Sequence, residues 1–176
     1  MAKAKQSARL CATSDVVDLG KALIAVADEY PTQFLTERDF FSLARAYLHG
    51  RFPGVSAEHR VKEGAIDFRL GGTNPSVLEL AVAPRALADA CHKQQRFPGH
   101  ISATQLYASQ NRSELRKLAR VAQAKARKRY LLLLDLRGLD HQDLKAGYLK
   151  WSARRRGGSP IRVVHVRRDS ERHFVI

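Results

Sequence analysis

The chain has 176 residues and a hydrophobic share of 44%, which indicate a single globular domain with a sizeable core. Its net charge is +14. No apolar run approaches the roughly 20 residues that a membrane span needs, and the basic N-terminal residues lead into no segment typical of a secretory signal. The two cysteines, Cys11 and Cys91, form no metal-ligand or redox spacing, so we expect a reducing, cytoplasmic location.

The positive charge is concentrated in the C-terminal part of the chain. Residues 111–176 contain 18 Lys and Arg against 6 Asp and Glu, whereas residues 1–110 contain 13 against 11. A basic region of this density predicts a polyanionic partner, namely nucleic acid. The charge alone leaves DNA and RNA open; as the partner we favour DNA, with RNA possible. The alternative is a solvated basic face without a ligand. The basic stretches lack large apolar neighbours, which disfavours a membrane surface as the partner.

The first elements in chain order are two helices. We expect residues 1–13 to form a flexible basic arm, followed by a single domain over residues 14–176. Apolar residues at helical spacing predict a helix from Ser14, its N-cap, to Pro31. A second helix is predicted after the N-cap Thr36, with Asp39 at its third position and Gly50 at its C-terminal end.

Three extended segments follow, at residues 58–63, 65–70 and 76–83. Strict alternation places Ile66, Phe68 and Leu70 on one face of the second segment, with Asp67 and Arg69 on the other. The glycines and Asn-Pro between residues 71 and 75 predict a turn, so the last two segments form a hairpin. The third segment is apolar on both faces, as expected of a central strand.

The rest of the chain alternates between helix and strand. Residues 104–126 are predicted to be helical, in one or two pieces, and Asn111 and Glu114 resemble a cap and its partner. A buried strand is predicted at 130–136, a helix at 140–151 and a final strand pair in 161–176. This order predicts an α/β fold with a central mixed β-sheet flanked by helices.

The predicted hairpin carries two carboxylates on neighbouring strands, Asp67 and Glu79. Two carboxylates that close repel each other, and the repulsion raises the pKa of one of them. A divalent cation removes this cost, and hard oxygen ligands suit Mg²⁺ or Mn²⁺. In the alternative interpretation Asp67 pairs with an arginine and Glu79 with Arg69 across the hairpin, as in many ion pairs that carry no chemistry.

The stretches GAIDFRLGG and SVLELAV, which carry these two acids, resemble the core of the PD-(D/E)XK nuclease-like superfamily. The resemblance covers residues 35–136 approximately. It implies a restriction-endonuclease-like core in which a helix, a β-hairpin, a second helix and a further strand follow one another. It also implies metal-dependent cleavage of phosphodiester bonds, with Asp67 and Glu79 as ligands of Mg²⁺ or Mn²⁺. Glu37 is the further acid expected from the lead-in helix, with Glu58 as its substitute.

The sequence departs from this family at Ala81, which occupies the position of the motif lysine. Three explanations remain open. Another cation takes the role of charge stabilisation, with Arg69 the nearest and Arg85 or Lys93 behind it. Alternatively, the metal ion alone suffices, or the site is inactive. The protein is therefore either a nuclease or a non-catalytic module that binds nucleic acid on the same fold. A homodimer or a larger nucleoprotein assembly is also open.

Clustered basic residues are the candidates for contact with the phosphate backbone. Four follow a helical stripe near residue 116, and the others form three short runs. The candidates are Arg112, Arg116, Lys117, Arg120, Arg127, Lys128, Arg129, Arg154, Arg155, Arg156, Arg167 and Arg168.

Overall fold

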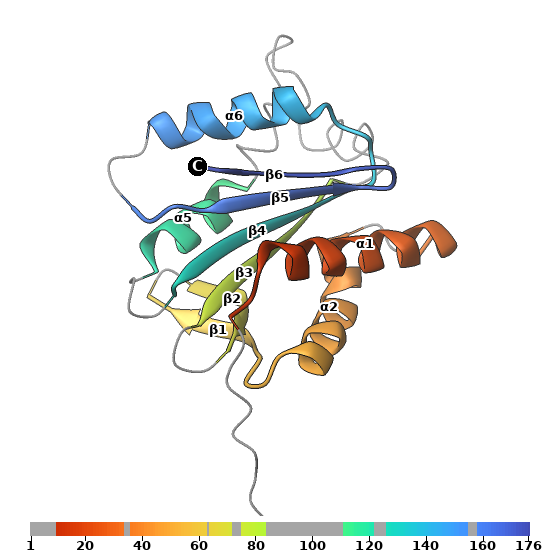
Figure 1. Ribbon diagram of the computed structural model, residues 1–176, viewed down its shortest axis with the longest axis horizontal. Helices are drawn as coiled ribbons and strands as arrows, with labels where there is room; N and C mark the ends of the chain where they lie inside the picture. Colours follow the sequence, from red (N-terminus) through yellow and green to blue (C-terminus); the bar gives the residue numbers. More distant parts are fainter. Residues whose placement is uncertain are drawn as a thin grey trace, which may run out of the picture.

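The computed structural model describes residues 10–33, 36–62, 64–71, 75–83, 111–121, 126–154 and 158–176, so most of the predicted N-terminal arm lies outside the described residues. Within these residues the fold is α/β, with one six-stranded mixed sheet and four helices (Figure 1). The prediction of an α/β fold with a mixed sheet is therefore confirmed. The helices are α1 (Thr13–Glu29), α2 (Glu37–Arg51), α5 (Arg112–Arg120) and α6 (His141–Ala153). The strands are β1 (Ser56–Val61), β2 (Gly64–Leu70), β3 (Ser76–Ala83), β4 (Lys128–Asp135), β5 (Arg162–Arg167) and β6 (Glu171–Val175).

The strands lie in the sheet in the same order as in the chain. β1, β2 and β3 form an antiparallel meander, β3, β4 and β5 are parallel to one another, and β6 returns antiparallel to β5. Two parallel pairs need crossover connections, and α6 lies between β4 and β5 in the chain as such a connection requires. The parallel strands occupy the centre, where both faces are covered.

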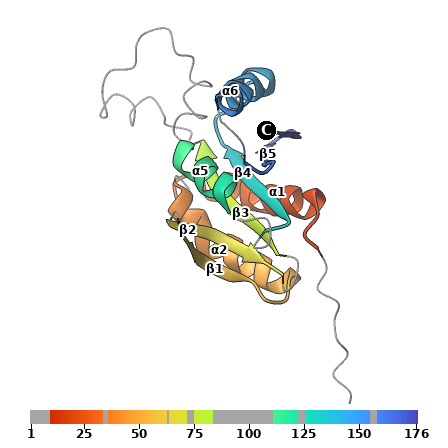
Figure 2. The ribbon, with the colours of Figure 1, turned by 90° about the vertical axis from the view of Figure 1, so that its left-hand side faces the viewer.

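Helices cover both faces of the sheet, and each face has its own apolar cluster. α1 and α2 pack with Leu80, Leu132 and Val164 on one face. α5 and α6 pack with Leu131 and Val163 on the other face. Figure 2 shows α5 and α1 on opposite sides of β3 and β4. The alternation of inward residues along each central strand thus divides one sheet between two cores.

The two N-terminal helices agree with the sequence in extent, but their ends differ in detail. α1 begins one residue before Ser14, and the carboxylate of Asp15 accepts a hydrogen bond from the Ala12 amide at 2.7 Å. The predicted N-cap Thr36 is confirmed, and its amide donates to the Asp39 carboxylate at 2.7 Å. The helix continues through Gly50 to Arg51, so Gly50 does not end it.

The helix predicted over residues 104–126 lies only partly in the described residues. There α5 covers Arg112–Arg120 and stops before Val121. Asn111 is the N-cap residue by position, but its side chain makes no capping bond to α5. The side-chain amide of Asn111 instead donates to the Tyr148 hydroxyl of α6 at 2.8 Å. The bond ties the start of α5 to the middle of α6.

The edge of the sheet is distorted at Asp67. Ile66 packs in the cluster under α5, whereas Phe68 and Leu70 pack in the cluster under α1 and α2, so the expectation that all three share a face is wrong. On β1, which begins two residues earlier than predicted, Glu58 lies opposite Asp67 and has a positive φ of 50°. The local departure from regular strand geometry changes the side-chain direction where the candidate acid lies.

Candidate active site

The two predicted acids lie side by side where β2 and β3 separate. Phe68 pairs with Leu78, so the antiparallel register brings Asp67 opposite Glu79. The Leu80 amide donates to the Asp67 carboxylate at 2.7 Å. The Asp67 side chain thereby satisfies a main-chain donor of β3. Glu79 is only 1% exposed, so its carboxyl group lies in the interior with Asp67 as its neighbour.

A lysine from α5 completes this pair. Lys117 Nζ lies 2.8 Å from Glu79 Oε1, and the same ammonium donates to the Ala65 carbonyl at 2.8 Å. The Lys117 side chain is 18% exposed. It is therefore fixed between β2 and β3, with access to solvent on one side. The alternative interpretation of the sequence has Glu79 paired with Arg69, and the structure shows Lys117 as an ionic partner of Glu79.

From the sequence, Lys117 was predicted to be one of the outward basic residues, and its contact with the acids was missed. Its position relative to the buried residues of α5 is the signal that was available. Leu115 and Leu118 face the core, and steps of about 100° per residue place Lys117 and Glu114 on one flank of that apolar stripe. Arg112 and Arg116 lie toward the other flank, so only part of the basic stripe can reach the sheet edge.

The protonation of the acid pair follows from its burial. Burial and the negative charge of Asp67 raise the pKa of Glu79 to about 9, against the opposing effect of Lys117. Burial also raises the pKa of Asp67, although the hydrogen bonds from the Leu80 amide and Glu79 oppose the shift. One proton is therefore shared between these two carboxyl groups at neutral pH in the absence of a further cation.

Lys117 keeps its charge in this setting. Burial lowers the pKa of Lys117, but the hydrogen bond and charge of Glu79 and the charge of Asp67 outweigh burial, and the net shift is upward. An ammonium group with a raised pKa is a poor general base at neutral pH. It is well suited to stabilise negative charge on a bound group.

Two further acids approach the cluster from α2 and α5. Burial, together with the charges of Asp67 and Glu114, raises the pKa of Glu37 to about 7. Glu37 is the first residue of α2, and its side chain keeps contact with solvent although the surrounding protein partly desolvates its carboxyl group. One oxygen of Glu114 accepts from the Ser113 hydroxyl at 2.7 Å, and the other is buried without a hydrogen-bond partner among the described residues. The cluster thus has more acidic groups than the single ammonium of Lys117 neutralises.

The donors of this cluster fit a hard divalent cation. Asp67 and Glu79 supply two adjacent carboxylates that cannot both ionise at low cost without added positive charge. Mg²⁺ is commonly held by one or two carboxylates with water in the remaining positions. Across the described residues no group of three or more His, Cys, Asp or Glu side chains is arranged to hold a metal ion. The fit therefore rests on the pair alone.

The remaining predicted site residues have other surroundings, although Glu58 lies opposite Asp67 on the neighbouring strand. Arg69 is two residues beyond Asp67 on β2, and its guanidinium donates to the Gly71 carbonyl at 3.4 Å. Ala81 is 2% exposed and belongs to the apolar cluster that contains Leu115 of α5, so a longer side chain at this position would enter the core. Glu58 is exposed on β1. The other two cation candidates, Arg85 and Lys93, lie outside the described residues.

The candidate phosphate-binding residues separate into groups. Six are exposed on the surface: Arg112, Arg116, Arg120, Arg127, Arg154 and Arg168. Lys128 donates to the Cys11 carbonyl at 3.1 Å. Arg129 is buried and donates to the Val121 carbonyl at 2.7 Å, so it holds the end of α5 rather than facing solvent. Arg155 and Arg156 lie outside the described residues.

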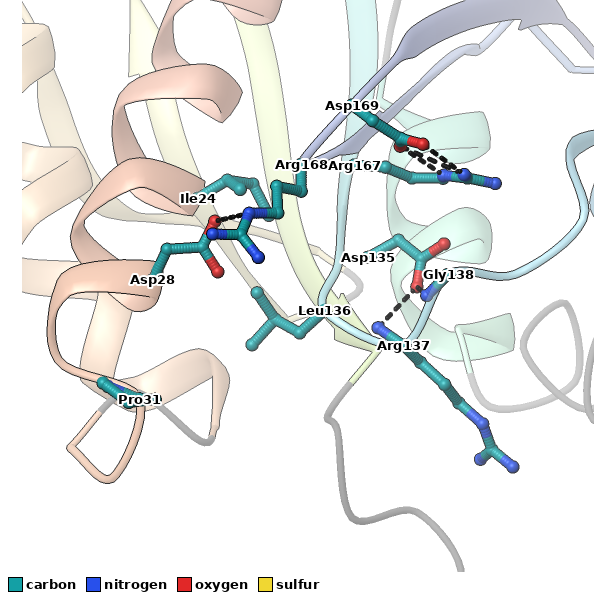
Figure 3. A pocket seen from close by; sticks show the side chains of 10 residues that line it. All are labelled: Ile24, Asp28, Pro31, Asp135, Leu136, Arg137, Gly138, Arg167, Arg168 and Asp169. Atoms are coloured by element: carbon teal, nitrogen blue, oxygen red, sulfur yellow. Dashed lines mark hydrogen bonds and ion pairs between the residues drawn. The ribbon is translucent and has the colours of Figure 1, made fainter.

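Arg167 and Arg168 lie at the C-terminal end of β5. They line a pocket of about 470 Å³ beside the C-terminal part of α1 (Figure 3). Arg167 pairs with Asp169 at 3.0 Å, and Arg168 pairs with Asp28 at 3.2 Å. Each of these guanidinium groups therefore has an acidic neighbour, which reduces the net positive charge that the pair offers to a ligand.

Comparisons of the chain with protein-family models, with curated proteins and with solved structures find no match. In the part of the chain that the structure describes, none of the helices has the length and apolar character needed to cross a bilayer. The basis for a function is therefore the geometry of the site itself.

Proposed function

We propose that this protein binds nucleic acid and cleaves its phosphodiester bonds with the help of a divalent cation at Asp67 and Glu79. The observation that carries the proposal is the convergence of the buried Glu79, the half-buried Asp67 and the Lys117 ammonium, with 2.8 Å between Lys117 Nζ and Glu79 Oε1. The paired acids would hold Mg²⁺ or Mn²⁺. When bound, the cation would supply Lewis-acid stabilisation of phosphate charge and a lower pKa for an attacking water.

Each residue of the chain has a distinct part in the proposed reaction. Asp67 and Glu79 provide the negative charge that retains the cation, and the bond from the Leu80 amide orients Asp67. Lys117 stabilises the negative charge that grows on the phosphate oxygens. Glu37, which is electrostatically coupled to Asp67, has a pKa of about 7, which suits it to exchange a proton with water or with the leaving oxygen at neutral pH.

The resemblance to the PD-(D/E)XK superfamily agrees with the order of elements around these residues. α2 precedes the β2–β3 hairpin, and α5 and β4 follow it. In this assignment Lys117 takes the part of the motif lysine that is absent at Ala81. The positive side chain then comes from α5 instead of from β3, and the Lys117 ammonium still reaches the carboxylate of Glu79.

The surface next to the site supports a polyanionic substrate. A helix that follows one parallel strand runs back along the sheet, so α5 and α6 end at the edge where β4 and β5 begin. Four basic residues lie at this end of the strands, and we call them the basic edge: Arg120, Arg127, Lys128 and Arg154. Arg120 is one turn from Lys117 on α5, so phosphates bound at the basic edge lie next to the proposed centre.

A non-catalytic binding module is the second candidate, and one observation favours it. The Lys117 ammonium already contacts Glu79 and neutralises part of the charge that a metal ion would need. In this version the ion pair is a structural replacement for the cation. The protein would then bind nucleic acid through the basic edge without cleaving it, alone or within a larger nucleoprotein assembly. Cytoplasmic location and homodimer formation remain predictions.

A nuclease assay separates these two candidates. Single- and double-stranded DNA and RNA would each be incubated with the protein and Mg²⁺, Mn²⁺ or a chelator. We expect cleavage that requires a divalent ion and is lost in Asp67→Asn, while the matched variant Asp143→Asn on the exposed side of α6 keeps it. Binding without cleavage in any condition supports the non-catalytic module. Cleavage that persists in Asp67→Asn or in chelator contradicts the proposed site.

A further inference from the structure

A second titratable cluster lies on the α6 face, away from the proposed centre. His165 on β5 is 1% exposed, and its Nε2 lies 2.8 Å from Asp135 Oδ2 at the end of β4. Its other ring nitrogen, Nδ1, lies 3.2 Å from Nδ1 of His141, the first residue of α6. A series of three side chains thus connects the interior of the sheet to the N-terminal end of a helix.

Asp135 fixes one end of this series as an acceptor. Its carboxylate also accepts from the amides of Arg137, Gly138 and Leu139 at 2.9, 2.9 and 2.6 Å. Burial opposes ionisation, but the hydrogen bond from His165 and those from the backbone outweigh burial and lower the pKa of Asp135. Because the carboxylate is ionised, His165 Nε2 must carry a proton.

The contact between the two imidazoles restricts how many protons the pair holds. A distance of 3.2 Å between two Nδ1 atoms is a hydrogen bond only when one of them carries a proton. The neutral pair satisfies this condition, and so does a pair with one added proton on the outer nitrogen of His141. A second added proton places hydrogen on both Nδ1 atoms, which brings two donors and two positive charges face to face.

We propose that Asp135, His165 and His141 form an acid-sensitive latch that holds the N-terminal end of α6 on the sheet and opens when a second proton is added to the pair of imidazoles. The latch shares no residue with the proposed cleavage site. It joins three separate elements, since Asp135 ends β4, His165 lies in β5 and His141 begins α6.

The surroundings of His141 also disfavour a second proton on the imidazole pair. Burial, the neighbouring His165, and the positive charges of Arg172 on β6 and Lys145 on α6 lower the pKa of His141, and Asp140 before the helix opposes them. The edge of the Phe174 ring packs against His141, with 5.6 Å between the ring centroids. Little negative charge is therefore available to stabilise a doubly charged pair once Asp135 is engaged by His165.

Opening of the latch would also affect α5, because α5 and α6 are in direct contact. Leu144 and Tyr148 of α6 are fully buried in the cluster that also contains Leu115 and Leu118 of α5. The Tyr148 hydroxyl accepts the hydrogen bond from Asn111 at the start of α5. Movement of α6 away from the sheet therefore removes one restraint on the helix that carries Lys117.

Amide hydrogen exchange between pH 7.5 and 4.5, corrected for intrinsic rates, tests the latch. We expect the protection of α6 amides to fall about tenfold more than that of β4 amides below the ordinary histidine pKa, because a pKa that differs by one between the closed and open states changes their ratio tenfold. In His141→Asn, whose amide still donates to His165 but does not titrate, α6 should keep its protection. His173→Asn on β6 removes an exposed imidazole that is not part of the latch and should behave as wild type.

Nitrogen NMR of the histidines in the unmodified protein gives a second readout that needs no variant. We expect a coupling across the hydrogen bond between the two Nδ1 atoms, and a second protonation step that coincides with the loss of α6 protection. Two independent titrations near the ordinary pKa without such a coupling would overturn the proposal. Equal loss of α6 protection in wild type and His141→Asn would also overturn it.

Discussion

Lys117 Nζ and Glu79 Oε1 lie 2.8 Å apart, although the two residues belong to a crossover helix and a central strand. This contact gives Glu79 of β3 a positive partner while position 81, two residues further along the strand, is occupied by alanine. The ammonium also donates to the Ala65 carbonyl of β2, so the same side chain bridges both strands of the hairpin. Its charge is thereby held next to the two acids that would retain a cation.

Replacement of this lysine by an apolar side chain of similar length tests the proposed role. In Lys117→Met we expect the divalent-dependent cleavage rate to fall about 100-fold or more, because a fixed charge-stabilising group is lost. Binding of nucleic acid should change much less, since only one cation is removed. Single-turnover cleavage rates and binding curves measure the two effects. Lys150→Met on exposed α6 is the control, and an unchanged rate in Lys117→Met would contradict the role.

A lysine placed at position 81, where the motif of the proposed superfamily has one, should not increase cleavage. Ala81 is 2% exposed and packs under Leu115 and Leu118, so Ala81→Lys forces a long charged side chain into the core. We expect the free energy of unfolding to fall by roughly 1–3 kcal/mol or more, with no gain in cleavage. Denaturant unfolding measures the loss, with Ala46→Lys on the exposed face of α2 as the control. A stable and faster enzyme would show that position 81 is not crowded.

Removing the titration of Glu79 should change how stability depends on pH. The pKa of Glu79 is raised from 4.5 to about 9, so the folded state binds more protons than the unfolded state between these values. The contribution of Glu79 to the free energy of unfolding is complete below pH 4.5 and is lost as the pH rises through 9. Glu79→Gln imitates the protonated form, because it donates to Asp67 and accepts from Lys117.

In a metal-free buffer, we expect wild type to lose stability relative to Glu79→Gln by an amount on the order of 2 kcal/mol from about pH 6 to about pH 9.5. Glu37, with a pKa of about 7, adds a loss of the same sign in both proteins. Thermal unfolding across this pH range provides the comparison, and Glu29→Gln at the exposed end of α1 is the matched control. Parallel pH profiles for wild type and Glu79→Gln would argue against a protonated Glu79.

Two helical glycines predict opposite effects of the same substitution. A Cβ at Gly20 would lie 2.6 Å from Val166 Cγ2 and 3.1 Å from Leu132 Cδ1, so α1 packs directly on β5 and β4 there. We expect Gly20→Ala to lower the free energy of unfolding by roughly 1–3 kcal/mol. A Cβ at Gly50 meets nothing within 4 Å, so Gly50→Ala should raise it by about 0.5–1 kcal/mol. Equal values for the two variants in urea titrations would show that α1 does not pack this closely.

The basic edge predicts a position-dependent effect on nucleic-acid affinity. Arg120→Gln and Arg127→Gln, at the edge where β4 begins, should weaken binding and lower the slope of log K against log salt by about one unit each. Arg168→Gln should change the slope less, because Arg168 pairs with Asp28 and lies at the other end of the strands, about 20 Å from the basic edge. Fluorescence anisotropy at several salt concentrations measures the slopes. A larger effect at Arg168 would relocate the binding surface.

The order of helices and strands was predictable because it depends on local patterns. Alternating and helical spacing of apolar residues predicted the elements around Thr36, Leu78 and Tyr130, and a short turn brought Asp67 opposite Glu79. The break of alternation at Asp67 was not predictable in this way. It depends on where Ile66 and Phe68 find space on the two faces of the sheet.

Contacts between distant elements were decided only by the tertiary structure. The sequence by itself determined the α/β order and the adjacent acids, since period and turn chemistry act over a few residues. It assigned Lys117 and Arg129 to a phosphate-binding surface, yet one reaches Glu79 and the other is buried beneath Val121. The packing of α5 and α6 on the sheet fixes which flank of each helix faces inward. The same packing creates the Lys117–Glu79 pair and the contact of His141 with His165.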